Sequence, residues 1–274
     1  MHRITMNVLE RWCMGLRHWQ KLERAEWLWS RARPIYVSML ARLAKNGLER
    51  VINQTDRLWV RPELRGVSQS YEPEVWAHLM SHIRPGDVVA DVGAFVGLYA
   101  LAIAQRVGSA GKVFAFEPDP QNFAILKSHV ELNKVTDRVS LFQAAVADCD
   151  GVTAFDAGGT CESHINSKAE TGAHSVRCVS LDTHLANTRL DILKIDVEGY
   201  EEVVLRGAIR LLQDRRRCPR LLYVETHPYA WPATGTSSES LLGLLTQCQY
   251  RVYDLQGQPA TAITRYGEIV AYKN

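Results

Sequence analysis

The sequence predicts an α/β fold: a doubly wound, mostly parallel sheet that ends in an antiparallel hairpin and is preceded by a helical N-terminal extension. Three observations predict it. From residue 87 onward, short β-branched runs alternate with helical patterns, which is typical of a parallel sheet covered by helices. The 274 residues are 46% hydrophobic, which suffices for one large domain with an appendage. The last 25 residues hold two strand-like runs with no helical segment between them.

The expected elements follow the chain in order. A helix with one apolar face is predicted over residues 73–83, ahead of the first strand. Parallel strands are predicted at residues 87–92, 112–117, 139–146, 191–196 and 221–225, and the antiparallel hairpin at residues 250–255 and 268–273. Further helices are predicted over residues 98–107, from Asp119 with Pro120 in its first turn, over residues 200–212, and after Ser237 or Ser238. Residues 151–181 show no clear periodicity, which predicts a long irregular insertion.

Composition excludes several classes of protein. The 18 Gly and 10 Pro are too few and too scattered for a fibrous or disordered chain. The net charge of +2 does not demand a nucleic-acid partner, so nucleic acid is disfavoured as a ligand. No two of the 6 cysteines are spaced as in a zinc knuckle or a redox pair, which favours a reducing cytoplasm. Charged residues interrupt the apolar run near the N-terminus, so no signal peptide is expected.

The N-terminal region differs from the rest of the chain. Residues 1–50 are rich in Lys, Arg and Trp, and apolar residues between positions 9 and 19 recur at helical spacing. This pattern favours a helix that packs on the main domain or on a second subunit, and the alternative is a helix on an anionic membrane surface. We therefore predict a helical extension and lead-in over residues 1–70 and a main domain over residues 71–274. The predicted location is cytoplasmic, with peripheral contact at the inner membrane surface as the alternative.

A glycine-containing turn, DVGAFVG, stands where the first strand of the main domain ends and a helix begins. Gly93 lets the turn adopt dihedral angles that other residues resist, and Gly97 removes the side chain where the backbone would approach a ligand. The turn lacks both the Gly-Lys-Ser/Thr end of a P-loop and the Gly-x-Gly-x-x-Gly dinucleotide fingerprint. Asp91, ahead of the glycines, would repel a pyrophosphate but could accept hydrogen bonds from an ammonium group. This pattern suits a zwitterionic nucleoside that carries a sulfonium.

The second strand of the main domain ends at Glu117, 20 residues after Gly97. In strand-loop-helix nucleoside sites, a carboxylate at this place binds both hydroxyls of a ribose. NAD and S-adenosylmethionine both offer that diol. Each residue also has a structural alternative: Asp91 capping a turn, the glycines permitting packing, and Glu117 capping the next helix. Their order and spacing after strands favour the cofactor interpretation.

Four stretches of the chain resemble a known family. They are DVGAFVGLYA (91–100), FAFEPDPQNF (114–123), AAVADCDG (144–151), and LKIDVEGYEEVVLRGA (193–208) followed by YVETHP (223–228). Together they resemble the FkbM-like branch of the S-adenosylmethionine-dependent methyltransferases, and the KIDVEGYE block is the most specific of them. The resemblance runs from about residue 71 to the C-terminus, and the first 50 residues lie outside it.

The resemblance implies the seven-stranded class I methyltransferase fold, S-adenosylmethionine as cofactor, and methyl transfer to oxygen. The implied acceptor is a hydroxyl of a sugar, a lipid-linked molecule or a natural product, so the partner is a small molecule or a glycan. The resemblance also implies that Ala144 and Ala145 contact the adenine and that Asp196 lies beside the methionine part. The sequence departs from the family at Phe95-Val96, where Asn-Ile is more usual. That departure changes the lining of the loop.

Ligands of open α/β sheets bind beyond the carboxyl ends of the strands, near the switch in strand order. The residues at those ends are Asp91, Glu117, Ala144, Ala145, Asp196, Glu198, Glu225 and His227. A hydroxyl that attacks a sulfonium methyl must be aligned and must lose its proton. Histidine, with an unperturbed pKa of about 6.5, suits a general base. His227 is therefore the predicted base, Glu198 and Asp196 are its competitors, and a turn-stabilising role for His227 before Pro228 is the alternative.

The same strand ends gather an acidic cluster with one imidazole. Asp196, Glu198, Glu225 and His227 could hold Mg²⁺ or another divalent cation that acidifies a bound hydroxyl. A divalent cation is the less favoured alternative, since a bound proton or hydrogen bonds would also relieve clustered carboxylates. Lys194 stands inside a predicted strand, so we expect its stem to be buried and its amine to reach a nearby carboxylate.

Three other functions stay open on the sequence alone. An NAD-dependent oxidoreductase is disfavoured by the missing third glycine and by the acid before the loop. RNA methylation by the same fold is permitted by the basic N-terminal region, although the main domain shows neither a stacking module nor a basic groove. The third is a binding protein without turnover whose N-terminal residues dock on a membrane, on a partner or on a second copy of the chain.

Overall fold

The computed structural model describes residues 47–64, 69–155, 161–162 and 174–274. The chain divides into two compact units, Met1–Gln69 and Ser70–Asn274. Within the described residues, none of the helices has the length and apolar run that crossing a membrane requires.

The described part of the first unit is a β-hairpin. Strands β1 (Leu48–Ile52) and β2 (Asp56–Val60) pair antiparallel, and a short 3₁₀ turn, η1 (Pro62–Leu64), follows. Residues 53–55 join the two strands, and Asn53 and Gln54 both have positive φ, which is typical of the tight turns of β-hairpins. The predicted helical extension is therefore wrong for these residues, because the turn and the alternating side chains specify strands. The tryptophan-rich helix predicted nearer the N-terminus lies outside the described residues.

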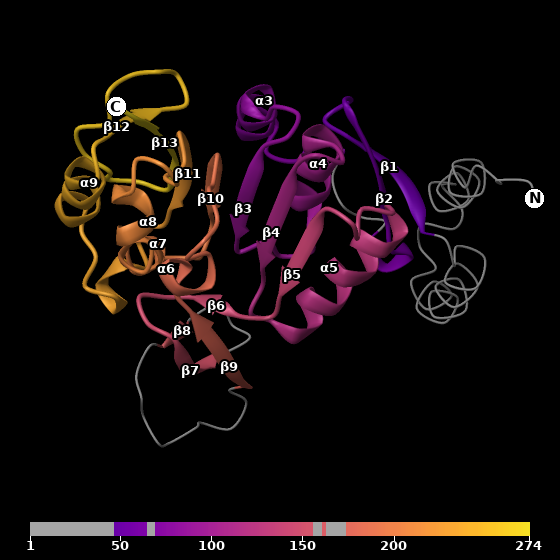
Figure 1. The fold of residues 1–274 in the computed structure, drawn as a ribbon, viewed down its shortest axis with the longest axis horizontal. Coiled ribbons are helices and arrows are strands. Elements are labelled where there is room, and N and C mark those ends of the chain that lie inside the picture. Colours follow the sequence, from indigo (N-terminus) through magenta and orange to yellow (C-terminus); the bar gives the residue numbers. More distant parts are fainter. Residues whose placement is uncertain (1–46, 65–68, 156–160, 163–173) are drawn as a thin grey trace, which may run out of the picture. The chain divides into compact units, whose positions relative to one another are not determined.

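The second unit is built on a seven-stranded sheet with the order β12-β13-β11-β10-β3-β4-β5. Its strands are β3 (Val88–Val92), β4 (Lys112–Phe116), β5 (Val139–Phe142), β10 (Ile192–Ile195), β11 (Leu221–Thr226), β12 (Tyr250–Asp254) and β13 (Gly267–Lys273). Strands β5, β4, β3, β10 and β11 are parallel, and β13 runs antiparallel to both β11 and β12 (Figure 1). The predicted doubly wound, mostly parallel sheet with a C-terminal hairpin is confirmed.

The strand order reverses between β3 and β10. From β3 the chain builds outward through β4 and β5, and it then returns to place β10 on the other side of β3. The loops that leave β3 and β10 therefore emerge side by side at the carboxyl edge of the sheet. Such a switch point is where open α/β sheets bind their ligands.

In the described part of the second unit, seven α-helices flank the sheets. They are α3 (Pro73–His82), α4 (Leu98–Val107), α5 (Pro120–Leu132), α6 (Leu181–His184), α7 (Glu201–Arg206), α8 (Ile209–Gln213) and α9 (Ser238–Gln247), with a 3₁₀ turn η2 (Trp231–Ala233). The helix predicted over residues 98–107 is confirmed at both ends. Asp119 caps α5 by accepting hydrogen bonds from the first turn, and Ser237 forms a reciprocal capping box with Ser240 at the start of α9.

The two faces of the main sheet differ in chemistry. Leu193 and Ile195 of β10 belong to an apolar core that also takes side chains from α6 to α9, and α7, α8 and α9 lie together beside β10 and β11 in Figure 1. Side chains alternate along a strand, so the residues between them face the other way. Lys194 of β10 and Asp91 of β3 lie on this second face. A polar patch therefore crosses the sheet at its carboxyl edge.

The predicted strand over residues 139–146 is interrupted. Its first half is β5, whereas β6 (Ala145–Val146) leaves the main sheet and begins a second sheet of order β6-β9-β7-β8. The other strands of this sheet are β7 (Gly151–Phe155), β8 (Cys161–Glu162) and β9 (His174–Val179). The prediction of an irregular insertion is therefore wrong for these three strands. Their short runs pair across a long separation, and local periodicity does not report such pairing.

The helix predicted over residues 200–212 is two short helices, α7 and α8. They separate at Gly207, where a β-carbon would lie 1.9 Å from the carbonyl oxygen of Ala147. The carbonyl oxygen of Gly207 also accepts a hydrogen bond from the N–H of Asp182 at 2.8 Å. Contact with a distant loop thus breaks a segment whose own sequence favours a continuous helix.

Candidate functional site at the switch point of the sheet

The loops after β3 and β10 touch through their backbones. Gly93 has φ +81°, and a β-carbon there would lie 1.7 Å from the carbonyl oxygen of Asp196. The glycine is required both by its left-handed conformation and by this close approach. The dihedral argument made from the sequence is confirmed, and the loop that approaches Gly93 belongs to the protein itself.

Gly97 has a different neighbour from the one expected. It has φ +89° and precedes α4, and a β-carbon there would meet Cδ1 of Leu126 from α5 at 2.3 Å. The sequence argument placed a ligand at this position. Helix packing therefore also requires a glycine here, and cofactor binding at Gly97 stays a prediction.

We expect Gly93→Ala to destabilise the domain strongly. The added methyl group would overlap a backbone oxygen that cannot rotate away, and alanine would carry a positive φ, so the loss should exceed about 3 kcal/mol. Gly86→Ala is the matched control, because Gly86 also has a positive φ but has open space around its β-carbon. Urea unfolding compares the two variants. Equal losses of unfolding free energy would contradict the importance of the contact with Asp196.

Asp91 is a buried carboxylate without a partner. Its side chain is fully inaccessible, and neither carboxylate oxygen has a hydrogen-bond partner. Burial raises its pKa to about 6, against the opposing effect of Lys194. A small cavity opens beside it, lined by Tyr71, Gly93, Phe95, Tyr99, Lys194 and Asp196. An unsatisfied buried carboxylate facing a cavity calls for a donor that a ligand would bring.

Glu117 links the end of β4 to the glycine turn. Its Oε2 accepts a hydrogen bond from the N–H of Phe95 at 2.8 Å, and its Oε1 accepts one from the N–H of Asp119 at 2.9 Å. Burial raises its pKa to about 7, although these backbone donors act in the opposite direction. The capping alternative fails, because Asp119 caps α5. Glu117 is therefore held at the carboxyl edge of the sheet, next to the turn.

Ala144 and Ala145 are placed differently from each other. Ala144 is buried in the apolar core, and Ala145 is half-buried at the start of β6. Beside them Phe142, at the end of β5, stacks on Phe116 with ring centres 4.8 Å apart and meets the His184 ring at 4.4 Å. Neither alanine, nor Glu117, is among the described residues that line the cavity beside Asp91.

Lys194 is buried and its amine reaches a carboxylate, as its position inside a strand predicted. It is 1% exposed, its Nζ donates to Asp196 Oδ2 at 3.2 Å, and it stands 4.7 Å from the centre of the Tyr99 ring. Burial alone would lower its pKa, but the carboxylates of Asp196 and Asp91 outweigh burial and hold the pKa above its ordinary value. The amine is thus a fixed positive charge beneath the switch point.

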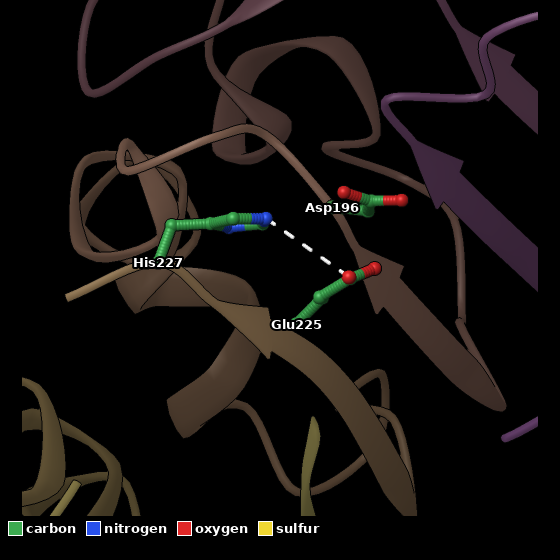
Figure 2. Close-up of side chains that lie close together, drawn as sticks. All are labelled: Asp196, Glu225 and His227. Carbon is green, nitrogen blue, oxygen red and sulfur yellow. Dashed lines mark ion pairs between the residues drawn. The ribbon is translucent and has the colours of Figure 1, made fainter. Parts of the chain in front are cut away.

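Three predicted site residues converge at the ends of β10 and β11. Asp196, Glu225 and His227 each offer one side-chain atom, and these atoms lie within 4.8 Å of one another. Figure 2 shows the imidazole directed at the carboxylate of Glu225, with Nε2 4.0 Å from Oε1. Nε2 also lies 3.4 Å from Oε2 of Glu198. The sequence rule that selected residues at strand ends therefore brought together side chains that do meet.

Glu201 holds the other side of the imidazole. His227 Nδ1 lies 2.7 Å from Glu201 Oε1, and this oxygen also accepts the N–H of Gly199 at 2.9 Å. Oε2 accepts the indole N–H of Trp231 at 2.8 Å, and Glu201 is fully buried. Burial would lower the pKa of His227, but the hydrogen bond to Glu201 and the charges of Glu198 and Glu201 outweigh it, so the pKa is raised.

Glu201 was not predicted from the sequence, although it is the last residue of the KIDVEGYE block. A glutamate in the first turn of a helix usually stabilises the helix end from the surface. Here it points inward instead, to a histidine that stands 26 residues further along the chain. The local sequence does not indicate this contact, because only the fold brings the histidine next to Glu201.

Carboxylates outnumber cations on this face. Glu225 stands directly opposite Glu268 across the β11 and β13 pair, and one buried oxygen of Glu268 has no hydrogen-bond partner. Burial raises the pKa of Glu225 to about 7 and that of Glu268 to about 8, with further increase from neighbouring acids. A ligand that brings positive charge or several hydrogen-bond donors would relieve these groups.

This arrangement defines a class: doubly wound α/β proteins that bind a ligand in a crevice at the carboxyl ends of the strands. Within it, residues 91–252 match the family model described as the methyltransferase FkbM domain. The chain belongs to this family and is a methyltransferase. The resemblance seen in the sequence is confirmed, and the NAD-dependent alternative is set aside.

Two curated relatives and one solved structure illustrate the likeness. The chain is 23% identical over 225 residues to the hexuronic acid methyltransferase AglP of Haloferax volcanii, covering 81% of this chain and 88% of that one. It is 31% identical over 131 residues to the 31-O-demethyl-FK506 methyltransferase FkbM of Streptomyces tacrolimicus, covering 47% of this chain and 49% of that one. The crystal structure of methyltransferase FkbM from Methylobacillus flagellatus aligns with a TM-score of 0.46 at 16% identity, covering 68% of this chain and 43% of that one.

Proposed function

We propose that this methyltransferase moves the methyl group of S-adenosylmethionine to a hydroxyl oxygen of a sugar, lipid-linked or natural-product acceptor. The observation that carries the proposal is the buried imidazole of His227, which is anchored through Nδ1 and directs Nε2 toward the carboxylates of Glu198 and Glu225. Transfer to a hydroxyl requires a group that takes the hydroxyl proton, and an anchored imidazole is suited to that role.

The residues at the switch point fit the proposed donor. The unpartnered Asp91 carboxylate would accept from its ammonium group, and the excess of acids favours a cationic ligand. Glu117 would bind the ribose hydroxyls, Asp196 would lie beside the methionine part, and Ala144 and Ala145 would border the adenine. When bound, S-adenosylmethionine supplies a methyl group that its sulfonium has already activated.

The protein's part in the reaction is to orient the acceptor hydroxyl and to take its proton. With Nδ1–H donating to Glu201, the lone pair of Nε2 is left to accept the acceptor's hydroxyl proton. The resulting imidazolium is stabilised by Glu201 on one side and by Glu198 on the other. Asp196 is already paired with Lys194, and Glu198 already accepts from the Tyr229 hydroxyl at 2.8 Å, which makes both weaker candidates for the base.

Incubation of the protein with a methyl-labelled donor and a cell extract tests the proposal. Mass analysis of the labelled product should find the label in a methyl ether, because a hydroxyl oxygen is the proposed nucleophile. Label on a nitrogen or a carbon would contradict transfer to oxygen. RNA in the extract serves as an internal comparison, since label recovered in RNA alone would favour the RNA alternative.

Glu117→Gln should weaken binding of S-adenosylhomocysteine about tenfold to a hundredfold, because the amide gives up one acceptor for the ribose hydroxyls and opposes one backbone N–H with an NH₂ group. Titration calorimetry measures the dissociation constant. Glu131→Gln, at an exposed position in the last turn of α5, is the control and should bind as the wild type does. Unchanged affinity in Glu117→Gln would remove Glu117 from the cofactor site.

A divalent cation at Asp196, Glu225 and His227 is the competing account. The donor set suits such an ion. However, Lys194 already occupies one oxygen of Asp196, and the Tyr266 hydroxyl donates to Glu225. We therefore expect methyl transfer to survive dialysis against EDTA. Loss of activity that Mg²⁺ alone restores would instead favour the cation.

A further inference from the structure

Two exposed tyrosines flank the imidazole of His227. The ring of Tyr229 meets it edge-on, with centres 5.8 Å apart at 88°, and the ring of Tyr266 is tilted against it at 5.3 Å and 54°. Tyr229 is 69% exposed and Tyr266 is 56% exposed. Few large hydrophobic side chains of the described residues are this exposed, and these two stand beside the proposed base.

Both rings are held in place through their hydroxyls. Tyr229 donates to Glu198, and Tyr266 donates to Glu225. Each hydroxyl is therefore satisfied by a carboxylate of the site, while most of each ring surface stays open to solvent. Open apolar surface does not stabilise the fold, and aromatic rings anchored at their polar end are typical of binding surfaces.

The neighbouring groups specify what such rings would bind. Carboxylate oxygens accept hydrogen bonds, so Asp196, Glu198 and Glu225 call for a ligand that carries several donors. The tyrosine rings call for an apolar face on the same ligand. A sugar ring combines the two, with hydroxyl donors around its edge and C–H groups on its faces. A flat phenol offers the apolar face but few donors.

The negative charge of the site narrows the choice of acceptor further. Three carboxylates surround the imidazole, and Lys194, the buried cation below them, is already paired with Asp196. An anionic sugar would place a further negative charge among these acids. Like charges at short range in a partly buried site are costly.

We propose that Tyr229 and Tyr266 form an acceptor subsite for a neutral, hydroxyl-rich sugar ring, which the two rings contact through its C–H faces while the carboxylates accept from its hydroxyls. The proposal rests on the proposed function, because it places the acceptor next to the imidazole that would take its proton. It goes further by naming the chemical class of acceptor and the side chains that select it.

Saturation-transfer NMR tests the subsite without requiring turnover. The probe is methyl β-D-glucopyranoside, added to the full chain in the presence of S-adenosylhomocysteine. We expect saturation to reach the ring C–H protons of the probe. The signal should fall at least about fivefold in the double variant Tyr229→Ala/Tyr266→Ala, because this variant loses two aromatic contacts whose modest contributions add. The double variant Tyr229→Phe/Tyr266→Phe keeps the rings and should retain most of the signal.

Controls separate binding from folding. Tyr253→Ala removes a partly exposed tyrosine of β12 and should leave the signal unchanged. The affinity of each variant for S-adenosylhomocysteine reports whether the domain is intact. Methyl β-D-glucuronide and catechol serve as the anionic and flat competitors, and we expect both to give weaker signals than the neutral glucoside.

Several results would overturn the subsite: no signal from the glucoside, the same signal in the alanine double variant with an intact fold, or a stronger signal from catechol or from the glucuronide. The outcome is distinguishable from failure of the proposed function. If sugar binding depends on the tyrosines but the protein transfers methyl groups to nitrogen, the proposed transfer to oxygen is contradicted and the subsite is supported. If methyl transfer to oxygen is unaffected by loss of both tyrosines, the proposed function is supported and the subsite is contradicted.

Discussion

His227→Asn is expected to reduce the rate of methyl transfer at saturating donor by about a hundredfold to a thousandfold, the usual contribution of a positioned general base. Asparagine keeps an N–H that can donate to Glu201, so the buried carboxylate stays paired. The variant loses the basic Nε2 that lies beside Glu198 and Glu225. Affinity for S-adenosylhomocysteine should be unchanged, because the expected cofactor contacts are made by other residues.

Single-turnover rates and titration calorimetry measure the two quantities separately. His82→Asn on α3 is the control, since it replaces a half-buried histidine whose Nδ1 lies 2.8 Å from a backbone carbonyl oxygen. Glu198→Gln tests the competing base directly. A normal rate in His227→Asn together with a large loss in Glu198→Gln would transfer the role of base to the glutamate.

Glu201→Gln is expected to lower the rate about tenfold and to move its pH dependence toward lower pH. The hydrogen bond to Glu201 raises the pKa of His227, against the effect of burial. A base works when it is unprotonated, so activity rises as pH passes its pKa. With a neutral partner that pKa falls, and the half-maximal rate should be reached at a lower pH than in the wild type.

The pH profile distinguishes positioning from a merely structural role. Trp231→Phe removes the hydrogen bond to the other oxygen of Glu201 but leaves the carboxylate charge, so its profile should stay near that of the wild type. Glu202→Gln, at the adjacent buried glutamate that pairs with Arg206, is the matched control for loss of a buried charge. A slower Glu201→Gln enzyme with an unshifted profile would mean that Glu201 only supports the fold.

The sequence predicted the main sheet well because its strands carry local signals. β3, β4, β10 and β11 are short runs of apolar and β-branched residues bounded by turn residues, and the carboxyl ends of parallel strands must share one edge. From this rule alone, Asp91, Asp196 and His227 were placed near the switch point. Helix α5 was equally predictable from the sequence, because Asp119 and Pro120 mark its first turn.

What the sequence could not predict depends on contacts between distant segments. The second sheet pairs residues such as Gly151 and Cys178, and the break between α7 and α8 comes from contact between Gly207 and Ala147. Tyr266 reaches Glu225 across 41 positions. In each case the local sequence permits several outcomes, and tertiary packing selects one of them.

Gly97 shows the same limit within the site. The sequence pattern identified a position that needs glycine, and the structure agrees that φ is positive there. The pattern did not reveal what lies in front of it, because a ligand and the side chain of Leu126 impose the same requirement for a missing β-carbon. A glycine in a turn therefore indicates a close approach without naming the group that approaches.

A solved complex with S-adenosylhomocysteine tests the central claim most directly. It should place the ribose hydroxyls on Glu117, the amino group toward the Asp91 carboxylate, and the sulfur on the side of the crevice that faces Nε2 of His227. A crevice that stays closed while the ligand binds elsewhere, or a ribose that makes no contact with Glu117, would contradict the account.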